Sequence, residues 1–222
     1  MKNLKKIIGI LFCCLFCLTL FVGCSVPLEQ LVSENVSEYR QNFFFGQNQN
    51  FSASFTDGQR EEEYIANGKK TKLVDFGVLV VRANKDIGTK PKFVLKINDK
   101  SFEGELEVNP FDRSLVADIE MRVGKDDKIV LTIDGEILEL QNLSSTWQIN
   151  CTKALNIFLE HNRQKISQYQ NKDSLDGEIF IKIVADKSNI SNIYYFVLFV
   201  GKDSNVIANL ICVKTGEIVQ KG

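Results

Sequence analysis

Apolar residues recur along the chain with two different periods, and the changes of period separate three segments. In residues 27–41 the apolar positions are three or four residues apart, which is the spacing of one face of a helix; these positions are Leu28, Leu31, Val32, Val36 and Tyr39. Pro27 suits the first turn of such a helix. The pattern predicts an amphipathic helix over residues 27–41, followed by three phenylalanines at 43–45 that we interpret as core filling.

From residue 51 to about residue 149 apolar and polar residues alternate instead. The clearest run places Phe102, Gly104, Leu106 and Val108 on one face and Glu103, Glu105 and Glu107 on the other. Similar runs occupy residues 73–82, 93–97, 115–123, 129–133 and 137–140. Strands with one apolar and one polar face are typical of antiparallel sheets, and short strands at regular spacing favour a sandwich or a strongly curved sheet. We therefore expect an antiparallel β domain over residues 47–146.

The last segment returns to helical spacing and then to strands. One helical stripe holds Cys151, Leu155, Phe158, Leu159, Ile166 and Tyr169, with Asn150 or Thr152 as the N-cap. Strands are predicted at residues 179–183, 193–200, 206–213 and 217–219, and the unbroken apolar run 193–200 is typical of a central strand buried on both faces. The pattern predicts an α+β domain over residues 147–222, with the helix packed on a three- or four-stranded antiparallel meander. The predicted fold class is α+β, rich in β.

Composition and charge agree with an ordinary globular chain. Of the 222 residues, 44% are hydrophobic and 25% are charged. Residues 24–222 hold 24 basic and 28 acidic side chains, a balance of −4. A weakly acidic surface gains nothing from counterion release on a phosphate backbone, which disfavours nucleic acid as a partner.

The first 25 residues have the form of an export signal. Three lysines precede the uncharged run from Ile7 to Val22, and this run of 16 residues is shorter than the roughly 20 that a spanning helix needs. We predict a signal peptide over residues 1–23. Phe21-Val22-Gly23-Cys24 resembles the lipobox of bacterial lipoproteins, in which the family prefers Leu at the place of Phe21.

This resemblance implies lipid attachment at Cys24, which becomes the new N-terminus after cleavage. It also implies a protein anchored by fatty acids, such as palmitate, at the extracytoplasmic face of the cell membrane. Residues 24–46 are then the anchor region and its amphipathic helix. Two or three acyl chains hold a protein stably on a bilayer, so the membrane is an expected partner.

Two cysteines, Cys151 and Cys212, remain beyond the predicted signal peptide and Cys24. In an exported chain they either form a disulfide or stay as two buried thiols. The predicted helix and strand allow both side chains to enter one helix–sheet layer, so both alternatives stay open.

The sequence offers no recognisable catalytic set, and we predict no catalytic, metal-binding or cofactor-binding residue. The one histidine, His161, lies off the apolar stripe of its helix, and we interpret it as a surface residue. We interpret the many carboxylates as solvated side chains of turns and strand faces.

We expect a non-enzymatic binding or assembly module of the cell envelope, with an envelope protein as a partner. One alternative is an inhibitor or regulator of envelope enzymes, because the segment Val213-Lys214-Thr215-Gly216-Glu217-Ile218 after a helix and meander resembles the PepSY unit. A second alternative is a hydrolase with a carboxylate site.

Overall fold

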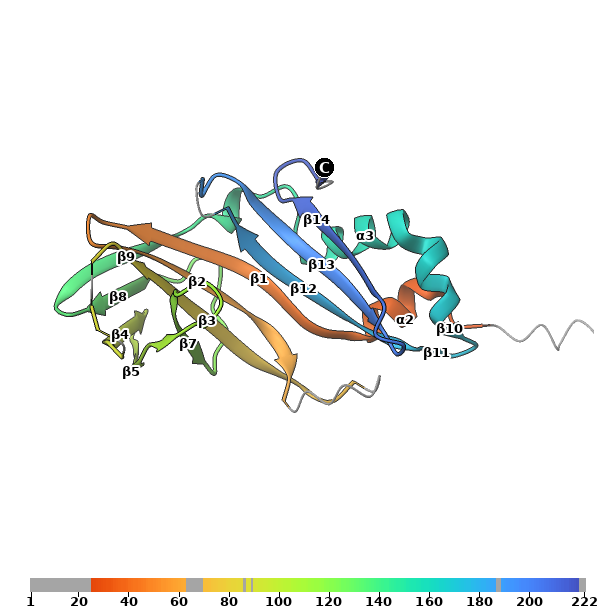
Figure 1. The fold of residues 1–222 in the computed structure, drawn as a ribbon, viewed down its shortest axis with the longest axis horizontal. Coiled ribbons are helices and arrows are strands. Elements are labelled where there is room, and N and C mark those ends of the chain that lie inside the picture. The colour runs from red at the N-terminus through yellow and green to blue at the C-terminus, as the bar shows by residue number, and fades with distance from the viewer. Residues whose placement is uncertain (1–24, 63–69, 86, 89, 187–188, 220–222) are drawn as a thin grey trace, which may run out of the picture.

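The computed structural model describes residues 25–62, 70–85, 87–88, 90–186 and 189–219 (Figure 1). The predicted signal peptide and Cys24 lie outside these residues. In chain order the elements are α2 (Leu28–Glu34), β1 (Val36–Gln47), β2 (Phe51–Glu61), β3 (Leu73–Ala83), β4 (Lys92–Ile97), β5 (Lys100–Glu105), β6 (Glu107–Val108), β7 (Leu115–Ile119), β8 (Ile129–Ile133), β9 (Glu136–Asn142), α3 (Cys151–Ile166), β10 (Gln170–Asn171), β11 (Ser174–Leu175), β12 (Gly177–Ala185), β13 (Ile193–Gly201), β14 (Val206–Cys212) and β15 (Ile218–Val219), with 3₁₀ turns at Ser144–Thr146 and Ser167–Tyr169. The β-rich α+β class predicted from the sequence is confirmed.

The long strand β1 pairs with three other strands of one large sheet (Figure 1). One of its edges pairs with β2 in antiparallel fashion from Glu38 to Gln47. Its other edge pairs first with β12, in parallel, and near its end with β9, where Phe44 lies opposite Asn142. The hydrogen-bonded sheet therefore branches at β1, and each branch has its own core.

We call the first branch the β unit; it consists of β2–β9 and the second half of β1. The strand order β6-β7-β3-β2-β1-β9-β8-β4-β5 curves around a core that includes Phe44, Phe55, Leu95 and Leu131. Inward and outward residues alternate along its strands, as the period of two predicts. All its strand pairs are antiparallel.

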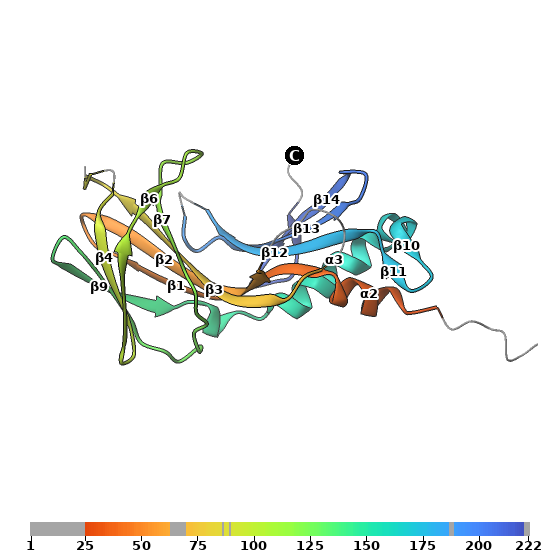
Figure 2. The same cartoon turned by 90° about the horizontal axis from the view of Figure 1, so that it is seen from below.

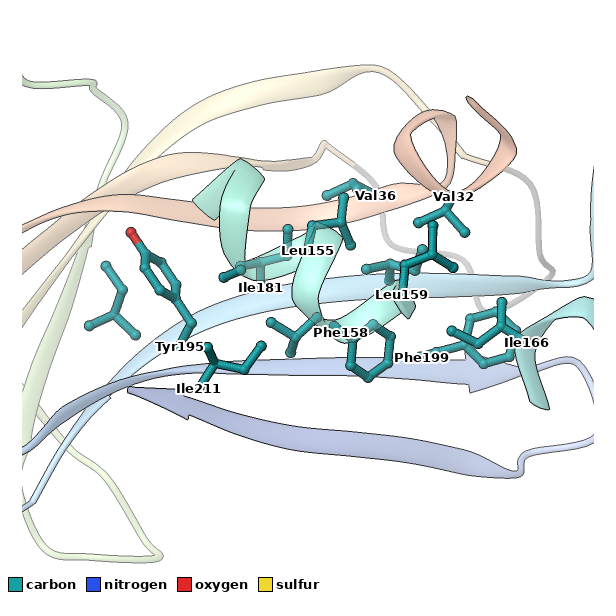
Figure 3. Packing of buried hydrophobic residues seen from close by; sticks show 14 of the residues in the cluster. Val32, Val36, Leu155, Phe158, Leu159, Ile166, Ile181, Tyr195, Phe199 and Ile211 are labelled. Atoms are coloured by element: carbon teal, nitrogen blue, oxygen red, sulfur yellow. The ribbon is translucent and has the colours of Figure 1, made fainter. Parts of the chain in front are cut away.

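We call the second branch the helix–sheet unit; it consists of the start of β1, β12–β15 and the two helices. α3 lies against one face of the β12–β14 sheet, and α2 packs beside α3 on the same side (Figure 2). Apolar side chains of α3, such as Phe158 and Leu159, pack there on Ile181, Tyr195 and Phe199 of the strands (Figure 3). Asn150 caps α3, because its Oδ1 accepts a hydrogen bond from Lys153 N at 2.9 Å.

The predicted helix over residues 27–41 is wrong in extent, because the helix covers only Leu28–Glu34 and the chain continues as β1. The N–H of Asn35 bonds back to Leu31 O and Val32 O and ends the helix. Beyond it, β12 and β2 offer backbone partners on both sides of β1, so tertiary pairing overrides the helical spacing of Val36 and Tyr39.

The prediction that β13 is buried on both faces is also wrong. Ile193, Tyr195, Val197 and Phe199 are buried against the helices, whereas the alternate residues from Tyr194 to Val200 are only half-buried. The helices cover one face of the sheet, and within the described residues no helix covers the other (Figure 2).

Candidate binding site

Within the described residues the β unit is open between β5 and β7, and a cleft lies at this opening. Among the strands that the structure describes, β5 is hydrogen-bonded to β4 alone, whereas β6, which follows directly, pairs with β7. The bend falls at Leu106, whose N–H donates to Pro91 O at 2.9 Å. Because β6 covers only Leu115 and Val116 of β7, the rest of the β7 edge faces β5 across a cleft of about 810 Å³. We call this opening the β5–β7 cleft.

The cleft has an apolar floor and an acidic rim. Phe93, Phe102, Ala117 and Ile119 reach it from the core of the β unit. Gly104 lets the ring of Phe93 lie against β5, since a Cβ there would stand 3.0 Å from Phe93 Cε1. The floor follows from the pleat, which turns every second residue of β5 and β7 inward.

The rim is formed by the alternate residues, Glu103, Glu105, Glu107, Asp118 and Glu120, all of which are exposed. Asp118 is held by Arg60 Nη1 at 2.8 Å from its Oδ2. The four glutamates form no ion pair within the described part of the chain. The rim therefore presents a group of carboxylates above an apolar floor, with Lys92 of β4 directly opposite Glu105 in the sheet.

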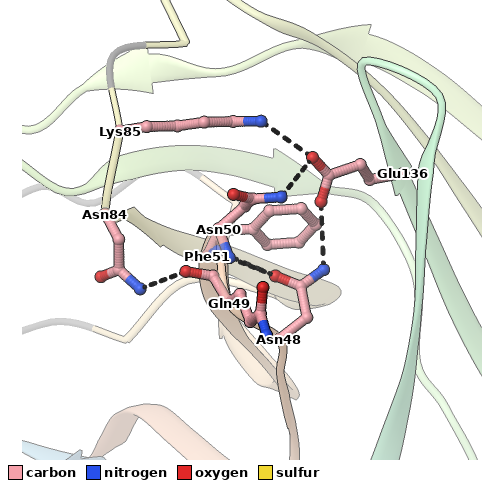
Figure 4. Close-up of polar contacts among 7 residues, drawn as sticks. All are labelled: Asn48, Gln49, Asn50, Phe51, Asn84, Lys85 and Glu136. Atoms are coloured by element: carbon pink, nitrogen blue, oxygen red, sulfur yellow. Dashed lines mark hydrogen bonds and ion pairs between the residues drawn. The ribbon is translucent and has the colours of Figure 1, made fainter.

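One end of the β unit is closed by a polar cluster around Glu136 (Figure 4). Its Oε1 accepts hydrogen bonds from Asn50 Nδ2 at 2.6 Å and from Lys85 Nζ at 2.8 Å, and Oε2 accepts one from Asn48 Nδ2 at 3.3 Å. The hydrogen bond from Lys85, followed by that from Asn50, holds the pKa of Glu136 below its usual range. This cluster joins the β1–β2 turn and the residues that follow β3 to the start of β9, and its two charged groups, Lys85 and Glu136, are paired with each other.

A second cleft of about 590 Å³ lies on the open face of the helix–sheet unit, beside Glu38, Phe180 and Lys182. Glu38 is already balanced, because Arg40 Nε lies 2.9 Å and Lys182 Nζ 3.5 Å from its carboxylate oxygens. Glu61 also borders this cleft, but both of its carboxylate oxygens are enclosed by protein atoms and have no hydrogen-bond partner among the described residues. A ligand in the cleft therefore does not reach the carboxylate of Glu61, and we rank this site second.

The two cysteines are free thiols, and the structure places them on opposite faces of the β12–β14 sheet. Cys151 lies at the start of α3, where burial raises the pKa of its thiol. Cys212 stands opposite Tyr194, on the face turned away from α3, because its neighbour Ile211 faces the helices. The idea that both side chains enter one helix–sheet layer is therefore wrong.

Burial acts to raise the pKa of the Cys212 thiol, but hydrogen bonds from Thr215 and the Lys214 backbone outweigh it and leave the pKa lowered.

His161 is exposed on α3. Within the described residues no three His, Cys, Asp or Glu side chains are grouped so as to hold a metal ion. No helix of the described part of the chain is both long enough and apolar enough to cross a membrane.

No protein-family model matches the chain, and no curated protein and no solved structure matches it significantly. The β5–β7 cleft is therefore identified as the candidate site from its geometry alone. Sequence reasoning placed Glu103, Glu105 and Glu107 on a solvated strand face, which the structure confirms. It missed that β5 has an unpaired edge, because alternation marks the faces of a strand and carries no signal for its edges.

Proposed function

We propose that this chain is a bacterial cell-envelope lipoprotein, anchored by lipid on Cys24 at the extracytoplasmic face, whose folded part is a non-enzymatic binding or assembly module. The observation that carries the binding role is the β5–β7 cleft, with its unpaired strand edges, apolar floor and acidic rim. Its rim carboxylates are all exposed, whereas the paired acid and base of a carboxylate hydrolase stand in different environments, one of them buried. Such a surface suits a polypeptide partner better than catalysis.

The anchoring role rests on the leader and on the position of the first helix. The basic and apolar leader ends in the lipobox-like Phe21-Val22-Gly23-Cys24, and α2 begins four residues after Cys24. α2 lies at one end of the molecule and the β4–β5–β7 region at the other (Figures 1 and 2). A lipid on Cys24 would hold the α2 end near the bilayer and leave the β5–β7 cleft at the far end of the molecule.

Metabolic labelling tests the anchor. The full chain, expressed in a bacterial host supplied with labelled palmitate, should take up label, and Cys24→Ala should take up none. Cys17→Ala, a change of another leader cysteine, is the matched control and should keep the label. Persistent labelling of Cys24→Ala would contradict lipid attachment at this residue.

Photo-crosslinking on intact cells tests the binding role. A photoreactive residue at position 120, on the rim of the cleft, should give a specific adduct with an envelope protein. The same residue at position 139, an exposed glutamate of β9, is the control because β9 is paired with both β8 and β1. Equal adducts at both positions, or none at position 120, would refute the role of the cleft.

A second candidate, a PepSY-like inhibitor or regulator of envelope enzymes, is favoured by the helix–sheet unit. α3 packs on β13 and β14, and Gly216, with φ of +79°, turns the chain after Cys212 into β15. This helix and meander are the features on which the resemblance rests. The test is whether the full chain slows endogenous protease or wall-hydrolase activity in envelope extracts; unchanged activity would refute it.

A further inference from the structure

We infer that the β5–β7 cleft binds an extended segment of a partner protein in which basic and apolar residues alternate, and that this segment adds to the sheet as a strand. The inference rests on the proposed binding function and specifies the chemistry of the partner at the same site.

The backbone provides the first reason. Within the described residues β5 pairs only with β4, and β7 pairs only with β3 between Ala117 and Ile119. Each edge carries backbone N–H and C=O groups that a further strand can satisfy. β6 pairs with β7 at Glu107 and Val116 and closes one end of the cleft, so a segment enters from the other end.

The pleat provides the second reason. A strand lying beside β5 shares its alternation, because neighbouring strands in a sheet turn their side chains to the same two faces. Inward residues of the segment would meet Phe93, Phe102 and Ile119, and outward residues would lie beside the rim. The segment therefore needs apolar residues at every second position. The six residues of β5 set its paired length.

Charge provides the third reason and predicts which residues stand at the outward positions of the bound segment. Glu103, Glu105 and Glu107 lie on one side of the cleft and Glu120 on the other, all exposed and without ion pairs in the described part of the chain. Lysine or arginine at the outward positions would stand beside these carboxylates, and opposite charges on adjacent strands stabilise pairing. An acidic segment would be repelled, so the rim selects for basic partners.

Synthetic peptides test the inference on the unaltered full chain in non-ionic detergent. The probe is a seven-residue fluorescent peptide in which lysine and valine alternate. One control has the same composition with the lysines grouped at one end, a second carries N-methyl groups at alternate amides, and a third has glutamate in place of lysine. We expect saturable binding of the alternating peptide and binding of each control weaker by about tenfold or more.

Two protein variants locate the site. Glu103→Lys combined with Glu105→Lys should weaken binding of the alternating peptide by about tenfold. Glu139→Lys, the same change on an exposed position of β9, should leave binding unchanged. The thermal midpoint of each variant, compared with that of the unaltered chain, reports whether the fold is retained. If a variant does not fold, binding of the alternating and control peptides to the unaltered chain still tests the inference.

Absence of binding by the alternating peptide overturns the inference. Equal binding of the grouped or N-methylated peptide also overturns it, because attraction then needs neither alternation nor backbone pairing. If crosslinking at position 120 captures a partner while the peptides show no preference, the proposed function stands and this inference fails. If the peptide preference holds and no crosslinked partner appears, the proposed cellular role fails alone.

Discussion

Asn162 and Asn209 are joined side chain to side chain across the interface between α3 and β14. Asn162 Nδ2 donates to Asn209 Oδ1 at 2.6 Å and also to Phe158 O at 2.9 Å. The side chain of Asn162 is buried with the apolar stripe of the helix. Because a buried amide must keep its partners, this contact fixes the helix in one register on the sheet.

Asn162→Ala should lower the free energy of unfolding by about 1–3 kcal/mol, since the half-buried amide of Asn209 then loses its partner on the helix. Urea denaturation of the full chain measures the change. Gln164→Ala, an exposed position of the same helix, should change it by less than about 0.5 kcal/mol. Equal effects of the two substitutions would show that the contact contributes nothing specific.

The α3 stripe shows what the sequence could and could not provide. Leu155, Phe158, Leu159 and Ile166 are recognisable from spacing alone, and all four are buried. Asn162 occupies the same stripe, but because it is polar, a pattern of apolar positions does not include it. Only the fold shows that β14 supplies a matching amide.

The same limit applies to strand pairing. The alternation of β5 and β8 predicts strands and their faces, because burial on one side imposes a period of two. Which strand lies beside which depends on contacts between residues far apart in sequence. The local sequence pattern therefore could not predict the parallel pairing of β1 with β12 or the open edge of β5.

Gly177 of β12 has no room for a side chain. A Cβ at this position would overlap the ring of Phe199 on β13 and would stand 2.8 Å from Val200 O. Gly177→Ala should therefore lower the free energy of unfolding by about 1–3 kcal/mol, as other overpacked sites do. Gly124→Ala is the control in the same denaturation measurement, because its Cβ would meet Asp127 Oδ1 at 3.4 Å, an ordinary contact. A stable Gly177→Ala variant would show that Phe199 can move aside.

Asp57 should make stability depend on pH. It is fully buried, and its Oδ2 accepts a hydrogen bond from Val123 N at 3.2 Å. Burial raises the pKa of this carboxyl, against the opposing influence of the Val123 hydrogen bond and the charge of Arg122. A raised pKa in the folded state means that the protonated form is favoured there. Stability is therefore lost as the pH rises from the ordinary aspartate pKa of about 4 through the raised value.

Asp57→Asn keeps an acceptor for Val123 N and removes the buried charge. Its free energy of unfolding should match that of the unaltered chain below about pH 4 and exceed it increasingly as the pH rises through the window above. Denaturation at a series of pH values measures the difference. Asp126→Asn, in an exposed turn, controls for the loss of one surface charge. A difference that stays constant with pH would contradict the raised pKa of Asp57.

The two thiols should differ in reactivity. Thiolate is the reactive form, burial raises the pKa of Cys151, and hydrogen bonds around Cys212 lower its pKa despite partial burial. In the folded full chain, iodoacetamide at about pH 7.5, below the ordinary thiol pKa, should therefore label Cys212 faster than Cys151. Mass spectrometry of the digested protein gives both rates, and unfolding in urea, which removes both environments, should make them similar. Labelling that appears at both positions only after reduction would show a disulfide, and it would contradict the placement of the two side chains on opposite faces of the sheet.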